Sequence, residues 1–74
     1  MEERIVEYLA LPLCEMSPPS LLDIAHHLHI SAEDAQRMVT TLEIENRIRE
    51  LHYDAYTLTR SERSQRRRHA VYAS

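Results

Sequence analysis

The sequence IAHHLHIS, at residues 24–31, lies between two segments that both show the apolar spacing of an amphipathic helix. The small Ala25 allows two helices to approach closely, and Leu28 and Ile30 are placed to fill the angle between them. Ser31 is a residue type that caps the start of a following helix. The stretch therefore predicts two helices that meet at an angle across a joint at residues 29–31.

Capping signatures mark the start of both helices. Ser20 with Asp23, and Ser31 with Asp34, both resemble a capping box, in which a hydroxyl accepts an orphan backbone N–H. Each cap precedes an apolar stripe at helical spacing, formed by Leu21, Ile24, Ala25 and Leu28 and then by Ala35, Met38, Val39 and Leu42. We expect one helix from Ser20 to the joint and a longer one from 32 to about 45.

Other elements are predicted on both sides of this pair. Ile5, Val6 and Leu9 fall at helical spacing behind an acidic first turn, so a helix is expected over 2–11, ended by Pro12. After Asn46 the apolar residues alternate with polar ones, which indicates a β-hairpin with strands over 47–52 and 55–59.

The chain contains no glycine, so other residues must occupy its tight corners. His29 stands at the helix joint and Asn46 follows the longer helix, and both residue types are enriched in the left-handed backbone region. The order helix, helix, short turn, helix, hairpin resembles the winged helix-turn-helix regulators over about residues 20–59, and the size and layout resemble the small fimbrial regulators of the PapI and FaeA type. The resemblance implies a mainly α fold with a small β-hairpin (α+β), three helices plus a wing, in a domain at 1–59.

The same resemblance implies a set of DNA-contacting residues. The resemblance places six residues on the DNA-facing side of the helix at 32–45: Ala32, Glu33, Gln36, Arg37, Thr40 and Thr41. Of these, Gln36 and Arg37 are chemically suited to base edges, and Thr40 and Thr41 to phosphates. Further contacts are expected from the wing and from the region after it, at Arg47, Arg49, Tyr53, Arg60, Arg63, Arg66, Arg67 and Arg68. Tyr53, at the wing tip, would contact a phosphate or a partner protein.

Charge is divided unevenly along the chain. Residues 1–59 hold four arginines and eleven acids, a net −7, whereas residues 60–74 hold five arginines and one acid, a net +4. The polar, arginine-rich end predicts a flexible tail at 60–74 that either contacts phosphates or keeps the domain in solution. Glu33 and Asp34 oppose DNA binding, because they lie at the helix end that would approach the duplex.

Two functions follow as hypotheses. The first is a DNA-binding transcriptional regulator that binds double-stranded DNA, and the second is a winged-helix adaptor, or an antagonist of a larger regulator, that binds a protein. No residues form a catalytic, cofactor or metal motif, so neither an enzyme nor a cofactor is expected.

The absence of an apolar segment long enough for a bilayer predicts a cytoplasmic protein with no membrane contact. The small size makes a homodimer a candidate state. Cys14, the one cysteine, is expected to be buried and inert or to pair between chains.

Overall fold

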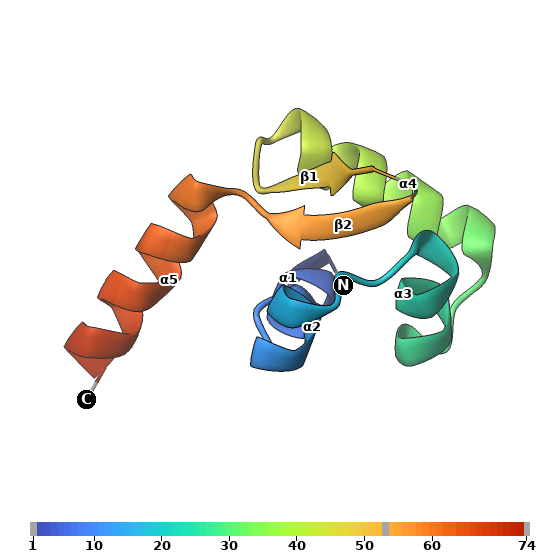
Figure 1. Ribbon diagram of the computed structural model, residues 1–74. Coiled ribbons are helices and arrows are strands. Elements are labelled where there is room, and N and C mark those ends of the chain that lie inside the picture. The colour runs from blue at the N-terminus through green and yellow to red at the C-terminus, as the bar shows by residue number, and fades with distance from the viewer. Residues whose placement is uncertain (1, 53, 74) are drawn as a thin grey trace.

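The computed structural model describes the backbone of residues 2–52 and 54–73, and the side chains of residues 2–52 and 54–66. The chain is mostly helical, with one antiparallel two-stranded sheet (Figure 1). In chain order the elements are α1 (Glu2–Leu9), α2 (Pro12–Met16), α3 (Leu21–Leu28), α4 (Ala32–Ile44), β1 (Ile48–Leu51), β2 (Ala55–Leu58) and α5 (Arg60–Ala73). The predicted α+β class, with a helix pair followed by a hairpin, is confirmed at this level.

Both predicted helix caps are present. The Ser20 hydroxyl accepts the backbone N–H of Asp23 at 3.2 Å, and the Asp23 carboxylate in turn accepts the backbone N–H of Ser20 at 3.1 Å. The Ser31 hydroxyl accepts the backbone N–H of Asp34 at 3.1 Å. These bonds satisfy donors that a helix start leaves without partners, so they fix where α3 and α4 begin.

The two expected left-handed corners are also confirmed. His29 has a φ of 59° and Asn46 a φ of 60°. At each corner the next backbone N–H returns to the helix: Ile30 donates to the Ala25 carbonyl at 3.0 Å, and Arg47 donates to the Leu42 carbonyl at 2.9 Å. Both helices therefore end in the same way without glycine.

The first helix is shorter than predicted. α1 ends at Leu9, not at residue 11, and Pro12 begins the separate short helix α2. Leu11 is extended, with a ψ of 139°, which is the conformation favoured before proline. Because the first position of a helix needs no N–H partner, Pro12 starts a helix as well as ending one.

One apolar core joins the helices to the sheet. Its buried side chains come from α1, α3, α4 and both strands: Ile5, Val6, Leu9, Ile24, Leu28, Val39, Leu42, Ile48, Tyr56 and Leu58. The small Ala25 and Ala35 are buried too, where α3 and α4 pack against each other. The hairpin is tied to the loop before α3, because the Tyr56 N–H donates to the Pro19 carbonyl at 2.9 Å.

The prediction of a flexible tail from residue 60 differs from the structure, in which the chain forms α5 there. The Thr59 hydroxyl accepts the backbone N–H of Glu62 at 3.2 Å, and the Thr59 carbonyl accepts that of Arg63 at 3.1 Å. Thr59 thus caps α5 as Ser20 and Ser31 cap α3 and α4. Side chains of the first turn also bind the body, so the packed unit extends beyond the predicted boundary at residue 59.

Candidate nucleic-acid interface

α4 carries four of the twelve residues predicted to contact DNA. Gln36, Arg37 and Thr40 are exposed, and Thr41 is half-buried. The Thr40 hydroxyl donates to the Gln36 carbonyl at 2.8 Å and accepts from the Gln36 side-chain amide at 3.1 Å. The Thr41 hydroxyl donates to the Arg37 carbonyl at 3.2 Å. Both hydroxyl protons are therefore engaged within the helix, although oxygen lone pairs remain available.

Arg37 is paired with an acid on the same face. Its Nη2 lies 3.7 Å from the Glu33 carboxylate, one helical turn away, and the two side chains are 73% and 86% exposed. An ion pair this exposed contributes little to stability, so Arg37 can exchange Glu33 for another anion at low cost. Glu33 and Asp34 nevertheless keep the start of α4 acidic, as the sequence indicated.

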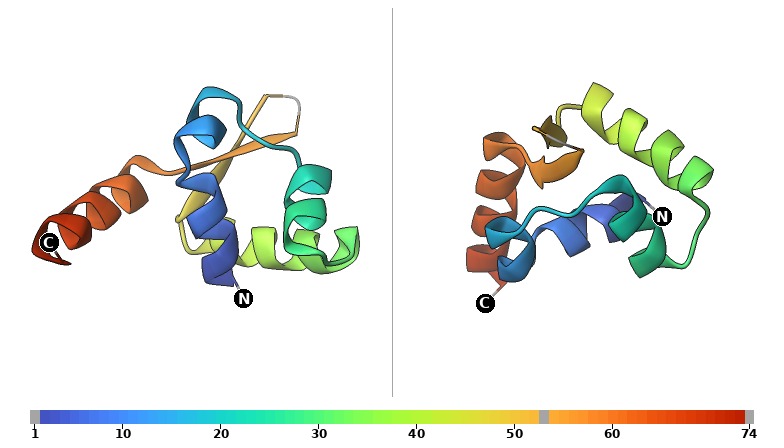
Figure 2. Two further views of the ribbon diagram at one scale, coloured as in Figure 1. Left: turned by 90° about the horizontal axis from the view of Figure 1, so that it is seen from below. Right: turned by 45° about the vertical axis from the view of Figure 1, so that its right-hand side comes forward.

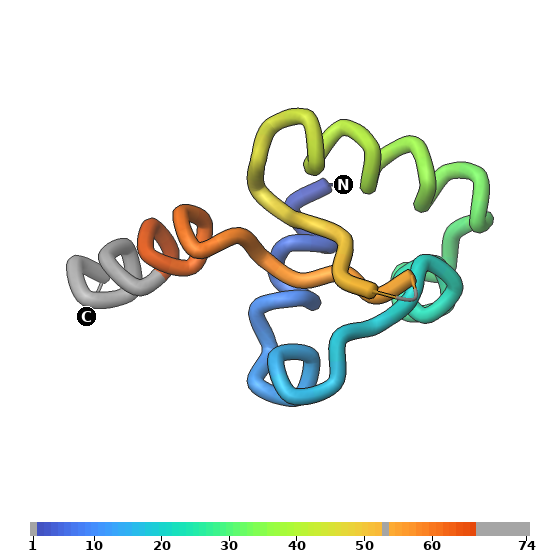
Figure 3. Tube along the Cα trace, turned by 45° about the horizontal axis from the view of Figure 1, so that its top comes forward, coloured from blue at the N-terminus to red at the C-terminus, as the bar shows by residue number. Residues whose placement is uncertain are grey.

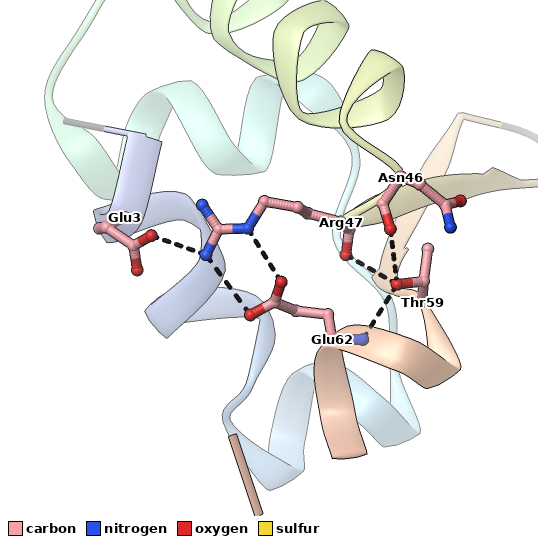
Figure 4. Close-up of polar contacts among 5 residues, drawn as sticks. All are labelled: Glu3, Asn46, Arg47, Thr59 and Glu62. Atoms are coloured by element: carbon pink, nitrogen blue, oxygen red, sulfur yellow. Dashed lines mark hydrogen bonds and ion pairs between the residues drawn. The ribbon is translucent and has the colours of Figure 1, made fainter. Parts of the chain in front are cut away.

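Arg47 is half-buried and contacts two acids (Figure 4). Its guanidinium is 2.6 Å from Glu3 at the start of α1 and 2.9 Å from Glu62 in α5, and only 27% of the Arg47 side chain is exposed. The hydrogen bonds that the Arg47 guanidinium donates to Glu62, and then those to Glu3, hold the pKa of Arg47 above its usual range. Arg47 therefore joins α1 and α5 to the corner after α4, and its guanidinium is engaged by two carboxylates; a contact between Arg47 and DNA stays a prediction.

Thr59 completes this contact cluster. Its hydroxyl donates to the Asn46 carbonyl at 2.9 Å, with the Arg47 carbonyl at 3.3 Å, while it accepts the Glu62 N–H. The left-handed corner at Asn46 is thereby bonded directly to the first turn of α5 (Figure 4). We call Glu3, Asn46, Arg47, Thr59 and Glu62 the corner cluster.

Arg63 is also held by internal partners. Its Nη1 is 2.6 Å from the Glu15 carboxylate of α2, and its Nη2 donates to the Thr57 hydroxyl at 2.8 Å. Thr57 is a buried polar residue, and its hydroxyl is bonded to Arg63. Arg63 is thus a poor candidate for a free phosphate contact.

The other predicted contact residues fall into three groups: exposed, half-buried, and outside the described residues. Arg49 and Arg60 are exposed, and neither forms an ion pair or side-chain hydrogen bond with any side chain that the structure describes. Arg66 is half-buried. Tyr53 and the side chains of Arg67 and Arg68 lie outside the described residues.

The helices that carry the predicted contacts lie far apart. In every view α5 leaves the body at the end opposite the corner between α3 and α4 (Figures 2 and 3). The fold measures 36 × 24 × 23 Å along its principal axes. The structure therefore brings Gln36, Arg37 and Thr40 together on one face, but it does not bring the α5 arginines to that face.

The cysteine and one of the histidines lie against Tyr8 or the buried interior of the fold. Cys14 is buried, as one reading of the sequence expected, and burial raises the pKa of its thiol. The ring of His27 stacks on Tyr8 with centroids 3.9 Å apart. Within the described residues, no three histidine, cysteine or acidic side chains gather in a way that could hold a metal ion.

Comparison of the sequence with protein-family models and with curated proteins gives no match. Among the described residues, no helix has both the length and the apolar character needed to cross a membrane. The residues that sequence reasoning missed are Glu15, Thr59 and Glu62. Thr59 and Glu62 had a readable signal, because a threonine three residues before a glutamate is itself a capping-box pattern.

Proposed function

We propose that this chain is a winged helix-turn-helix domain that binds duplex DNA, with α4 entering the major groove, as a transcriptional regulator in the cytoplasm. The observation that carries the proposal is the single exposed face of α4 formed by Gln36, Arg37 and Thr40. This helix begins directly after the left-handed corner at His29 and is followed at once by the hairpin. Such an order presents the second helix of the pair outward, beside a flanking wing.

The polar residues of this face have the chemistry of base readout. Glutamine can form two hydrogen bonds with adenine, and arginine can form two with guanine, each contributing about 1–3 kcal/mol of discrimination. Arg37 is free to do so once it leaves the weak, exposed pair with Glu33. Arg49 on the hairpin supplies a charge for the backbone beside the groove.

Arg37→Ala is expected to weaken binding to a short duplex at least tenfold, because it removes the arginine on the exposed face of α4. Fluorescence anisotropy at several salt concentrations measures both the affinity and its dependence on salt. Arg4→Ala is the matched control, since Arg4 is an exposed arginine on α1. Equal losses in the two variants, or an affinity that does not fall with salt, would exclude the groove model.

Glu33→Gln is expected to raise the affinity for the same duplex severalfold. The change removes a negative charge from the approaching end of α4 and releases Arg37 from its ion pair. Stability should fall by only about 0.3–1 kcal/mol, because an acid in the first turn interacts favourably with the helix dipole. The same anisotropy titration, with Glu7→Gln on α1 as the control, measures the effect. A loss of affinity in Glu33→Gln would show that α4 does not face the duplex.

A protein-binding module is the second candidate, and exposed apolar side chains favour it. Leu13 and Met16 on α2 are 75% and 85% exposed. Neighbouring large apolar groups on a surface are typical of protein contacts, and they could equally join two copies of this chain. Pull-down and sedimentation experiments test this function. It would be favoured over the first if duplex binding stays undetectable and if a stoichiometric partner, or a dimer of the chain, is found with the wild type but not with Leu13→Ser.

A further inference from the structure

A large apolar side chain is exposed at the end of α4. Ile44, the last residue of α4, is 80% exposed, and it lies one turn beyond Thr40 on the outer face of the helix. A single exposed isoleucine is ordinary on a protein surface. The charges around Ile44 therefore decide what kind of partner could cover it.

Four exposed acids lie near this end of α4: Glu43, Glu45, Glu50 and Asp54. Glu50 is opposite Tyr56 in the sheet. Burial first, and then the charges of Glu50, Asp54 and Glu43, raise the pKa of Tyr56 to about 12, so three of the acids lie around one side chain. None of the four forms an ion pair with any arginine side chain that the structure describes. We call Ile44 and these four acids the acidic surface.

The stability of α4 does not explain the acids at its end. The last turn contains no basic residue, and Glu43 and the C-cap Glu45 place negative charge at the negative end of the helix dipole. Acids in this position oppose helix formation, whereas a positive group there favours it. A positively charged partner would therefore relieve an unfavourable arrangement.

The chain itself carries a segment of matching charge. Residues 60–74 hold five arginines and one acid, a net +4, whereas residues 1–59 carry a net −7. Three consecutive arginines at 66–68 are followed in the sequence by the apolar residues 70–72. The segment thus combines the positive charge that suits the acids with apolar groups that suit Ile44.

α5 does not bring this segment to the acidic surface of its own chain. Its first turn is fixed to the body by Glu62, which pairs with Arg47, and by Arg63, which pairs with Glu15. From there α5 continues as one helix to Ala73 and leads away from α4 and the hairpin (Figures 1 and 2). Because a continuous helix does not turn back, the segment is free for a second copy of the chain.

We propose that α5 of one copy of this chain docks on the acidic surface of a second copy. A two-fold axis allows both copies to make the contact at once, so that each α5 covers Ile44 of the other. This interface differs from the exposed face of α2 at Leu13 and Met16. It goes beyond the proposed function, because it requires no DNA.

Sedimentation velocity of the full chain over a range of concentrations tests the proposal. The wild type is expected to dimerise at low salt and to dissociate between about 0.1 M and about 1 M salt, as the Debye length falls from about 10 Å to about 3 Å. Glu43→Arg is expected to weaken dimerisation by about tenfold or more, because a two-fold dimer contains the altered contact twice. Glu7→Arg on α1 makes the same change in net charge and should leave dimerisation unchanged.

A mixing experiment makes the test specific for the two surfaces. Glu43→Arg with Glu45→Arg should fail to dimerise, and so should Arg67→Glu with Arg68→Glu, because the segment at 60–74 then loses its net positive charge. An equimolar mixture of the two double variants is expected to restore dimers, since unchanged α5 then meets an unchanged acidic surface and the altered α5 meets the altered surface. Circular dichroism establishes that each variant is folded.

Four results would overturn the proposal. Two of them are a wild type that stays monomeric at low salt, and two folded double variants that form no mixed dimer. Dimers that Glu43→Arg keeps and Leu13→Ser loses would assign the interface to α2 instead. Dimers that disappear after nuclease treatment would be bridged by nucleic acid. Because every one of these measurements is made without added duplex, their outcome is separate from that of the proposed DNA binding.

Discussion

Arg47→Ala is expected to lower the free energy of unfolding by about 2–3 kcal/mol, because it leaves the Glu62 carboxylate without its partner in a site where only 7% of that side chain is exposed. The loss of the Glu3 contact adds little, since Glu3 is largely exposed. The stability of a domain of this size is about 4–11 kcal/mol, so the variant should lose a large part of it.

Urea unfolding followed by circular dichroism measures this effect, and the neighbouring strand provides its control. Arg49→Ala removes an arginine two residues away that has no partner among the described side chains, so its effect should stay within about 0.5 kcal/mol. Replacing both partners, as Arg47→Met with Glu62→Leu, should recover most of the loss, because no unpaired charge then remains buried. Similar midpoints for Arg47→Ala and Arg49→Ala would show that the corner cluster does not stabilise the fold.

The features that could be predicted from the sequence are those that depend on neighbouring residues. A serine cap needs only an N–H three residues later, and a left-handed corner needs only a residue type that tolerates it, so α3, α4 and the turns at His29 and Asn46 were predictable. The hairpin was predictable too, because the alternation of Ile48 and Leu58 with polar residues indicates strands, and β1 (Ile48–Leu51) and β2 (Ala55–Leu58) lie within the predicted ranges 47–52 and 55–59.

Contacts between distant segments were not predictable in this way. Arg47 and Glu62 are fifteen positions apart, and nothing in their local sequence shows that they pair. The arginine-rich composition after residue 60 predicts a flexible tail, whereas Thr59 and Glu62 form a local capping pattern, and the structure has the cap. The Pro12 signal was ambiguous, since proline both ends one helix and begins another.

In the candidate site, too, local features were predictable and contacts between distant segments were not. The exposed face of α4 followed from helical spacing, which places Gln36 and Thr40 one turn apart. Which arginines are free to bind a ligand depends on tertiary neighbours: Arg47 and Arg63 pair with acids, whereas Arg49 and Arg60 have no ion-pair partner among the described side chains. The useful measure for such a chain is the number of charges that the fold leaves uncompensated, which a sequence count does not supply.

Alkaline pH is expected to destabilise the fold through Tyr56. This side chain is buried, and burial, followed by the charges of Glu50, Asp54 and Glu43, raises its pKa from 10.0 to about 12. The raised pKa means that the folded state favours the neutral phenol. The contribution of Tyr56 to the free energy of unfolding is therefore complete below pH 10 and is lost as the pH rises towards 12. The total loss is about 2–3 kcal/mol, at 1.36 kcal/mol for each pKa unit.

Tyr56→Phe separates this effect from general alkaline unfolding. Phenylalanine keeps the buried ring but carries no ionisable group, so its free energy of unfolding should decline much less between pH 10 and pH 12 than that of the wild type. Tyr8, whose pKa burial also raises, leaves a residual slope in both proteins. Urea titrations at several pH values between 10 and 12 measure the difference. If the free energies of unfolding of the two proteins decline in parallel, Tyr56 ionises without cost and is not enclosed between the sheet and the helices.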